Sequence, residues 1–106
     1  MIKIMVNIQL QLQPQTEERF RKILAQYHNQ EVFAKNIIAY QIAELKRALL
    51  NIRLDLQQFE QKYQLETKEF YQQFQTGSIK DTEDFMIWAG IYEMFQQNSR
   101  KIEELQ

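Results

Sequence analysis

Residues 38–63 have the sequence IAYQIAELKRALLNIRLDLQQFEQKY, in which one apolar side chain recurs every three or four positions. The recurring residues are Ile38, Ile42, Leu45, Leu49, Ile52, Leu56, Phe59 and Tyr63. Steps that alternate between four and three residues are typical of a coiled-coil seam. We therefore predict one long helix over about residues 31–64 that pairs with a second copy. Its predicted dimer core consists of Ile38, Ile42, Leu45, Leu49, Ile52 and Leu56.

A second interpretation of this stripe stays open, because an apolar helix face also packs against other helices of its own chain. The length of the predicted helix favours self-association. At 1.5 Å per residue it spans roughly 50 Å, which is more than a compact domain of this size needs.

The composition limits the kinds of protein that this chain can be. It has 106 residues, with no cysteine, one histidine, two glycines and one proline. Disulfides and thiolate metal sites are therefore excluded. No phosphate-binding glycine loop and no nucleophile beside a supporting histidine can be recognised. We expect a protein that is not an enzyme, has no catalytic residues and holds neither a cofactor nor a metal.

The apolar start of the chain is too short for a signal peptide, because amides interrupt it from Asn7 onward. No later apolar run approaches the roughly 20 residues of a membrane span. We therefore expect a cytoplasmic protein without a membrane partner. Charge divides the chain into a first half, residues 1–53, with a net charge of 8 − 4 = +4, and a second half with 5 − 10 = −5. This asymmetry indicates nucleic acid as a partner of the first half and a basic protein as a partner of the second.

From Ile4 to Gln13 every second residue is apolar (Ile4, Val6, Ile8, Leu10 and Leu12), and from Asn7 onward the residues between them are amides. A period of two places these side chains on opposite faces of a β-strand. Because nothing else in the chain resembles a strand, we expect this strand to pair with another copy of itself. Pro14 ends the strand, and a first helix with Phe20, Ile23, Leu24 and Tyr27 on one face follows before a turn at residues 28–30.

This order of strand, helix, turn and helix resembles the ribbon-helix-helix family of DNA-binding proteins. In that family two chains pair their strands into a ribbon that enters the major groove. The resemblance implies that Lys3, Asn7, Gln9 and Gln11 contact operator DNA. It places Val6, Ile8 and Leu10 in the dimer core. Amide side chains suit the DNA-contacting role because they bond to adenine in pairs.

Aromatic residues concentrate in the C-terminal part, with seven of the thirteen between Phe70 and Phe95. Thr67 is a candidate cap for a short helix that Gly77 ends in a left-handed conformation. Asp81 or Thr82 then begins a last helix. The aromatic residues fit either the core of this helical hairpin or the anchors of a protein interface.

Several segments of this part together resemble the tails of small prokaryotic type II antitoxins. They are residues 68–77 (KEFYQQFQTG), 81–85 (DTEDF), Trp88-Ala89 and Tyr92-Glu93-Met94. The resemblance implies that the protein neutralises a cognate toxin by binding it. Repression of its own operon through Asn7, Gln9 and Gln11 is a further expectation. The partner-binding residues that the resemblance implies are Phe70, Tyr71, Phe74, Phe85, Trp88 and Tyr92.

Together these interpretations predict a mainly α-helical fold with one N-terminal β-strand, arranged as a ribbon-helix-helix-like homodimer. Residues 1–64 are expected to dimerise and bind DNA, and residues 65–106 to bind the toxin. Two other functions remain open: a stand-alone ribbon-helix-helix transcription regulator, and a dimeric helical scaffold that does not bind DNA.

Overall fold

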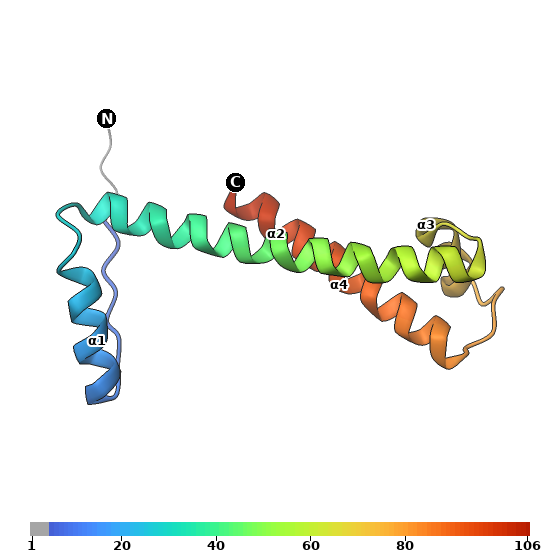
Figure 1. Ribbon diagram of the computed structural model, residues 1–106, viewed down its shortest axis with the longest axis horizontal. Helices are drawn as coiled ribbons and strands as arrows, with labels where there is room; N and C mark the ends of the chain where they lie inside the picture. Colours follow the sequence, from blue (N-terminus) through green and yellow to red (C-terminus); the bar gives the residue numbers. More distant parts are fainter. Residues whose placement is uncertain (1–4) are drawn as a thin grey trace. The chain divides into compact units, whose positions relative to one another are not determined.

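The computed structural model describes residues 5–106, which form four helices joined by short turns (Figure 1). The helices are α1 (Pro14–Leu24), α2 (Gln30–Tyr63), α3 (Thr67–Gln75) and α4 (Glu83–Leu105). Pro14 is the first residue of α1, a position where the missing N–H of proline leaves no hydrogen bond unmade. The mainly helical part of the predicted fold is confirmed, and α2 lies within one residue of the bounds predicted for the long helix.

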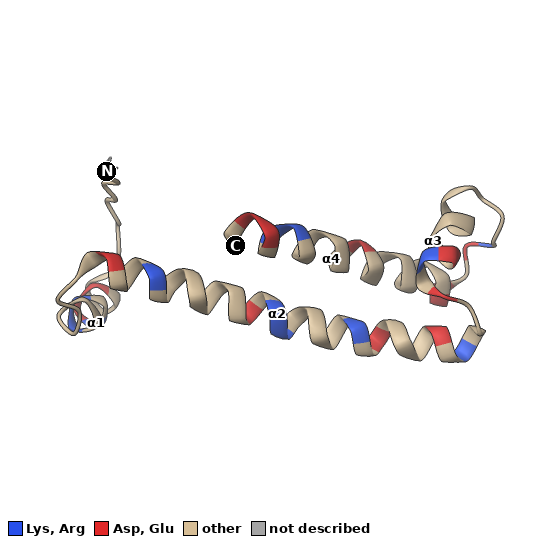
Figure 2. Cartoon of the chain, turned by 90° about the horizontal axis from the view of Figure 1, so that it is seen from above, with Lys and Arg blue, Asp and Glu red and all other residues tan. Residues whose placement is uncertain are grey.

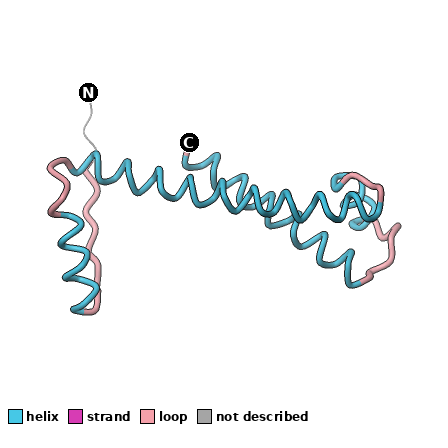
Figure 3. Tube along the Cα trace, in the orientation of Figure 1, coloured by secondary structure: helices cyan, strands magenta, loops and turns pink. Residues whose placement is uncertain are grey.

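The predicted β-strand is wrong for the residues that the structure describes. Residues 5–13 belong to no strand and are drawn as loop in Figure 3, whereas Ile4 lies outside the described residues. Val6, Ile8 and Leu10 are exposed. A period of two orders the side chains, but a strand also needs a neighbour for its backbone hydrogen bonds, and residues 5–106 offer none. The ribbon-helix-helix-like fold is therefore corrected to an all-helical one over this range.

The chain forms two compact units whose boundary lies within α2, between Asn36 and Ile37. In the described part of unit 1, Phe33 from the start of α2 meets two aromatic rings edge to face. Its ring centroid lies 6.2 Å from that of Phe20 and 5.2 Å from that of Tyr27. These contacts hold α1 and its turn against the first residues of α2.

Unit 2 contains the rest of α2 together with α3 and α4, and its turns are set by specific residues. Gly77 has a φ of 77° and ends α3. Its N–H donates to the carbonyl of Phe74, and that of Ser78 donates to the carbonyl of Gln73. This is a Schellman ending, so the left-handed glycine predicted here is confirmed. Thr82 caps α4, since its Oγ1 accepts a hydrogen bond from the Phe85 N–H at 3.1 Å.

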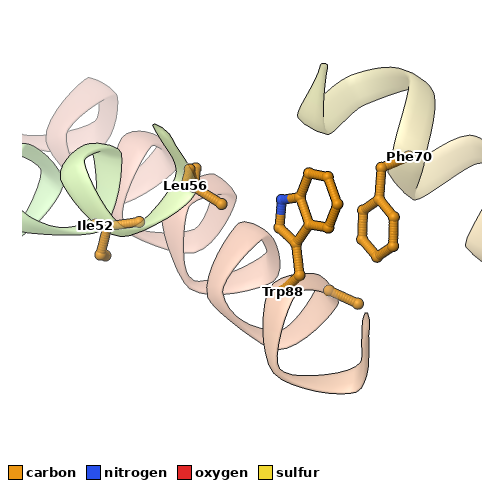
Figure 4. Packing of buried hydrophobic residues seen from close by; sticks show 5 residues of the cluster. Ile52, Leu56, Phe70 and Trp88 are labelled. Carbon is orange, nitrogen blue, oxygen red and sulfur yellow. The ribbon is translucent and has the colours of Figure 1, made fainter. Parts of the chain in front are cut away.

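The predicted seam of α2 packs within unit 2. Ile52 and Leu56 are buried in one cluster with Phe70, Trp88 and Ala89 from α3 and α4 (Figure 4). Toward the start of α2 the burial decreases: Ile42, Leu45 and Leu49 are half-buried and Ile38 is exposed. The second interpretation of the heptad stripe, packing within one chain, therefore holds for Ile52 and Leu56.

Among residues 5–106, none of the helices has the length and apolar character needed to cross a membrane. Basic residues (blue) and acidic residues (red) are distributed along both α2 and α4, as Figure 2 shows.

Candidate protein-binding surfaces

Phe70 and Trp88, two of the six residues predicted to bind a partner, form the centre of unit 2. Both side chains have 0% of their surface exposed. Their rings stack face to face, with centroids 3.8 Å apart and 3° between the planes (Figure 4). Phe59 of α2 stacks on Trp88 as well, with centroids 5.5 Å apart. Neither Phe70 nor Trp88 can reach a partner while this core is intact.

Thr67 connects the three helices of unit 2 through two hydrogen bonds. Its Oγ1 accepts the indole N–H of Trp88 at 3.1 Å, and its backbone N–H donates to Glu60 Oε2 at 2.8 Å. The cap predicted for Thr67 is therefore wrong, because this hydroxyl serves the buried indole and Glu66 occupies the N-cap position. A buried indole N–H without an acceptor would carry the cost of desolvation, which explains a threonine at this position.

The other four predicted partner-binding residues are half-buried and pack against the same core: Tyr71, Phe74, Phe85 and Tyr92. Tyr71 has a polar neighbour from α4, since its hydroxyl donates to Glu93 Oε1 at 2.9 Å. This hydrogen bond raises the pKa of Tyr71 above its ordinary value. These residues thus hold α3 on α4, which is the core interpretation that the sequence left open.

A polar cluster at Asp84 joins α4 to the end of α2. Lys62 Nζ donates to Asp84 Oδ2 at 2.7 Å, and the Tyr63 hydroxyl donates to the same oxygen. These two hydrogen bonds lower the pKa of Asp84, and the bonds to Asp84 raise the pKa of Lys62 and of Tyr63. Because each group has a partner within the chain, this cluster is a structural contact between the two helices.

The side of α2 that faces away from its seam carries an exposed apolar stripe that the sequence prediction missed. Tyr40, Leu50 and Leu54 are 62%, 60% and 52% exposed. Ala43 and Arg47 lie between them, and the five residues are spaced three, four, three and four positions apart, which places them on one helix face with Arg47 in the middle. The spacing of these residues could have been read from the sequence. It was missed because the prediction followed only the heptad series on the opposite face of the helix.

A second exposed surface lies on α4. Ile87 and Met94 are 47% and 52% exposed, and Gly90 lies between them on the same face. Within the described chain nothing lies within 4 Å of the position that a Cβ of Gly90 would occupy.

Three of the four residues predicted to bind DNA lie on a segment that belongs to no strand. Lys3 lies outside the described residues, and Asn7, Gln9 and Gln11 are exposed on a segment without a strand. The apolar side chains of this segment, Ile8 and Leu10 among them, line an open groove of about 580 Å³ against α1. Among residues 5–106, no group of three or more His, Cys, Asp and Glu side chains could hold a metal ion.

No protein-family model, no curated protein and no solved structure matches this chain.

Proposed function

We propose that the protein works by binding another polypeptide, and specifically that it is an antitoxin that neutralises a protein toxin by covering it. The resemblance of residues 68–94 to antitoxin tails supports the specific form of the proposal. The exposed stripe of Tyr40, Leu50 and Leu54 supports the general form and is the observation that carries it.

This stripe is a fitting binding surface because it combines exposed apolar groups with a rigid support. Large apolar side chains that lie together on a surface mark sites of protein interaction. Leu50 and Leu54 project from the part of α2 whose opposite face, Ile52 and Leu56, is anchored in the core of unit 2. A partner that covers the stripe therefore meets a helix that is already ordered, which lowers the entropic cost of binding.

The charges beside the stripe define the chemistry of the partner. Arg47 lies within the stripe, between Ala43 and Leu50. Lys46 and Arg53 flank the stripe on one side, and Glu44 and Asp55 flank it on the other. Arg47 is paired with Glu44, and the Arg53 guanidinium lies 5.5 Å from the ring centroid of Phe95. Lys46 is exposed. Asp55 is exposed as well, so the stripe carries charges of both signs at its margins, and we expect the toxin surface to be apolar at its centre and to carry both signs of charge at its rim. In this proposal the aromatic core supports the binding helix, and the toxin does not contact Phe70 or Trp88.

Operon repression is not part of the proposal, because it relied on a strand ribbon that residues 5–13 do not form in this structure.

A growth assay tests the antitoxin function. Each protein encoded beside this chain's gene is first expressed alone, and one that inhibits growth of the host is then expressed together with the wild-type chain, with Leu50→Glu/Leu54→Glu, or with Gln41→Glu. Gln41 is an exposed position of α2 outside the stripe and serves as the matched control. We expect the wild type and Gln41→Glu to restore growth and the double variant to fail at equal protein level. Restoration by the double variant would contradict the assignment to the stripe, and absence of rescue by the wild type would contradict the antitoxin function.

A further inference from the structure

We propose that α4 is the interface between two copies of this chain, packed antiparallel about a two-fold axis with Met94 of one copy over Gly90 of the other. This inference does not rest on the antitoxin function, because it uses a different helix and a different set of residues.

The interface would be formed by a stripe on α4, here called the α4 stripe, that has a symmetric spacing. Its members are Glu83, Ile87, Gly90, Met94, Gln97 and Lys101, separated by four, three, four, three and four residues. Steps of three and four keep all six on one helix face. The five side chains are exposed, and α3 packs near Tyr92 and Glu93, away from this face. The stripe is thus available to a partner along the length of α4.

Gly90 is the residue that the chain's own fold does not explain. It lies inside α4, where glycine destabilises a helix relative to alanine. Nothing lies within 4 Å of where its Cβ would be, so no contact within the described chain requires the absence of a side chain. A second helix packed on this face would explain the glycine. The distance between two packed helices depends on the size of the side chains at their contact, so a residue without a side chain lets them approach closely. Methionine suits the resulting gap, being flexible enough to fill irregular space.

The symmetric spacing fixes the register of the two helices. When a copy of the α4 stripe is reversed and Gly90 is set opposite Met94, Ile87 lies opposite Gln97 and Glu83 lies opposite Lys101. The two-fold axis produces each of these contacts twice, as expected for an isologous dimer. Within residues 5–106 neither Glu83 nor Lys101 takes part in a salt bridge. In this register one Glu83–Lys101 pair lies at each end of the interface, and the Gly90–Met94 contacts form its apolar centre.

The mass of the purified protein in solution, measured by light scattering over a range of concentrations, tests the contact at Gly90. We expect a wild-type dimer, and Gly90→Leu should weaken dimerisation by at least about thirtyfold because two overpacked contacts form per dimer. The open space at Gly90 means that the monomer should keep its helical content, as judged by circular dichroism. Gln96→Leu, at an exposed position of α4 outside the stripe, should remain a dimer. A monomeric wild type, or a Gly90→Leu variant that dimerises like the wild type, would overturn the proposal.

Charge reversal tests the register independently. Glu83→Lys and Lys101→Glu should each weaken the dimer by roughly five- to tenfold, since each places two pairs of like charges face to face. The double variant should recover most of the loss, because the pairs are restored with their signs exchanged. Glu103→Lys, at an exposed position of α4 outside the stripe, is the matched control and should have no such effect. Additive losses in the double variant would rule out the proposed register.

Discussion

The indole ring of Trp88 lies flat on the ring of Phe70, with centroids 3.8 Å apart and 3° between the planes. Trp88 comes from α4 and Phe70 from α3, and both are fully buried. With Ile52 and Leu56 from α2, this pair brings three helices into one core. The aromatic residues of the C-terminal part therefore explain how unit 2 folds before they explain what it binds.

Trp88→Ala should lower the free energy of unfolding by about 3–5 kcal/mol, because it removes a large buried ring and leaves a cavity. Thr67→Val should cost about 1–3 kcal/mol, since the buried indole N–H loses its acceptor while the side-chain volume is kept. Chemical denaturation of the free protein measures both values. Gln96→Ala at the exposed surface is the control and should change little. A Trp88→Ala variant as stable as the wild type would contradict the assignment of this residue to the core.

Gly77→Ala should destabilise the protein by about 1–2 kcal/mol, because the φ of 77° is unfavourable for a residue with a Cβ. No atom obstructs a Cβ at this position, so the cost comes from the backbone alone. Gly77→Asn should lose less, since asparagine tolerates the left-handed region better than other residues. Thermal unfolding compares the variants with Gln73→Ala, an exposed change in α3. Equal stability of Gly77→Ala and the wild type would show that α3 ends differently in solution.

The stability of the protein should depend on the ionisation of Asp84, whose pKa is lowered by hydrogen bonds from Lys62 and Tyr63. A carboxylate with a lowered native pKa stabilises the fold above the unfolded-state pKa of about 3.9. This contribution is lost as the pH falls from there through the native pKa. The raised pKa values of Lys62 and Tyr63 also stabilise the fold, but at pH values below about 10. This contribution is lost as the pH rises above about 10.

Asp84→Asn should flatten both ends of this pH dependence, as measured by the denaturant midpoint at a series of pH values. Asp81→Asn is the matched control, because Asp81 is exposed and takes no part in this cluster. If the two variants have the same pH profile, the hydrogen bonds at Asp84 do not contribute to stability.

The helices were predictable from the sequence because their signals are local. The heptad series identified α2, Gly77 identified the end of α3, and Thr82 was one of two candidates for the start of α4. The strand was not predictable in the same way, since alternation at residues 5–13 says nothing about a hydrogen-bonding neighbour. A local pattern thus identified where a helix begins and ends, but not whether an extended segment pairs.

The surfaces were harder to predict, because burial depends on which helices meet. Ile52 and Leu50 are both apolar residues of α2, yet Ile52 is buried and Leu50 is 60% exposed. In the same way, a tryptophan such as Trp88 is common both in interfaces and in cores. Its stacking on Phe70 in the structure is what assigns it to the core. Sequence spacing places residues on a common helix face, whereas contacts between helices decide which face remains free.

The most direct test of the account is a calorimetric titration of the purified chain with the protein encoded beside its gene. We predict saturable binding that Leu54→Glu weakens by about ten- to hundredfold, the loss expected when a leucine no longer contributes to the contact. Gln41→Glu should bind like the wild type. No binding by the wild type, or equal binding by Leu54→Glu, would contradict the claim that the protein works by binding this partner through α2.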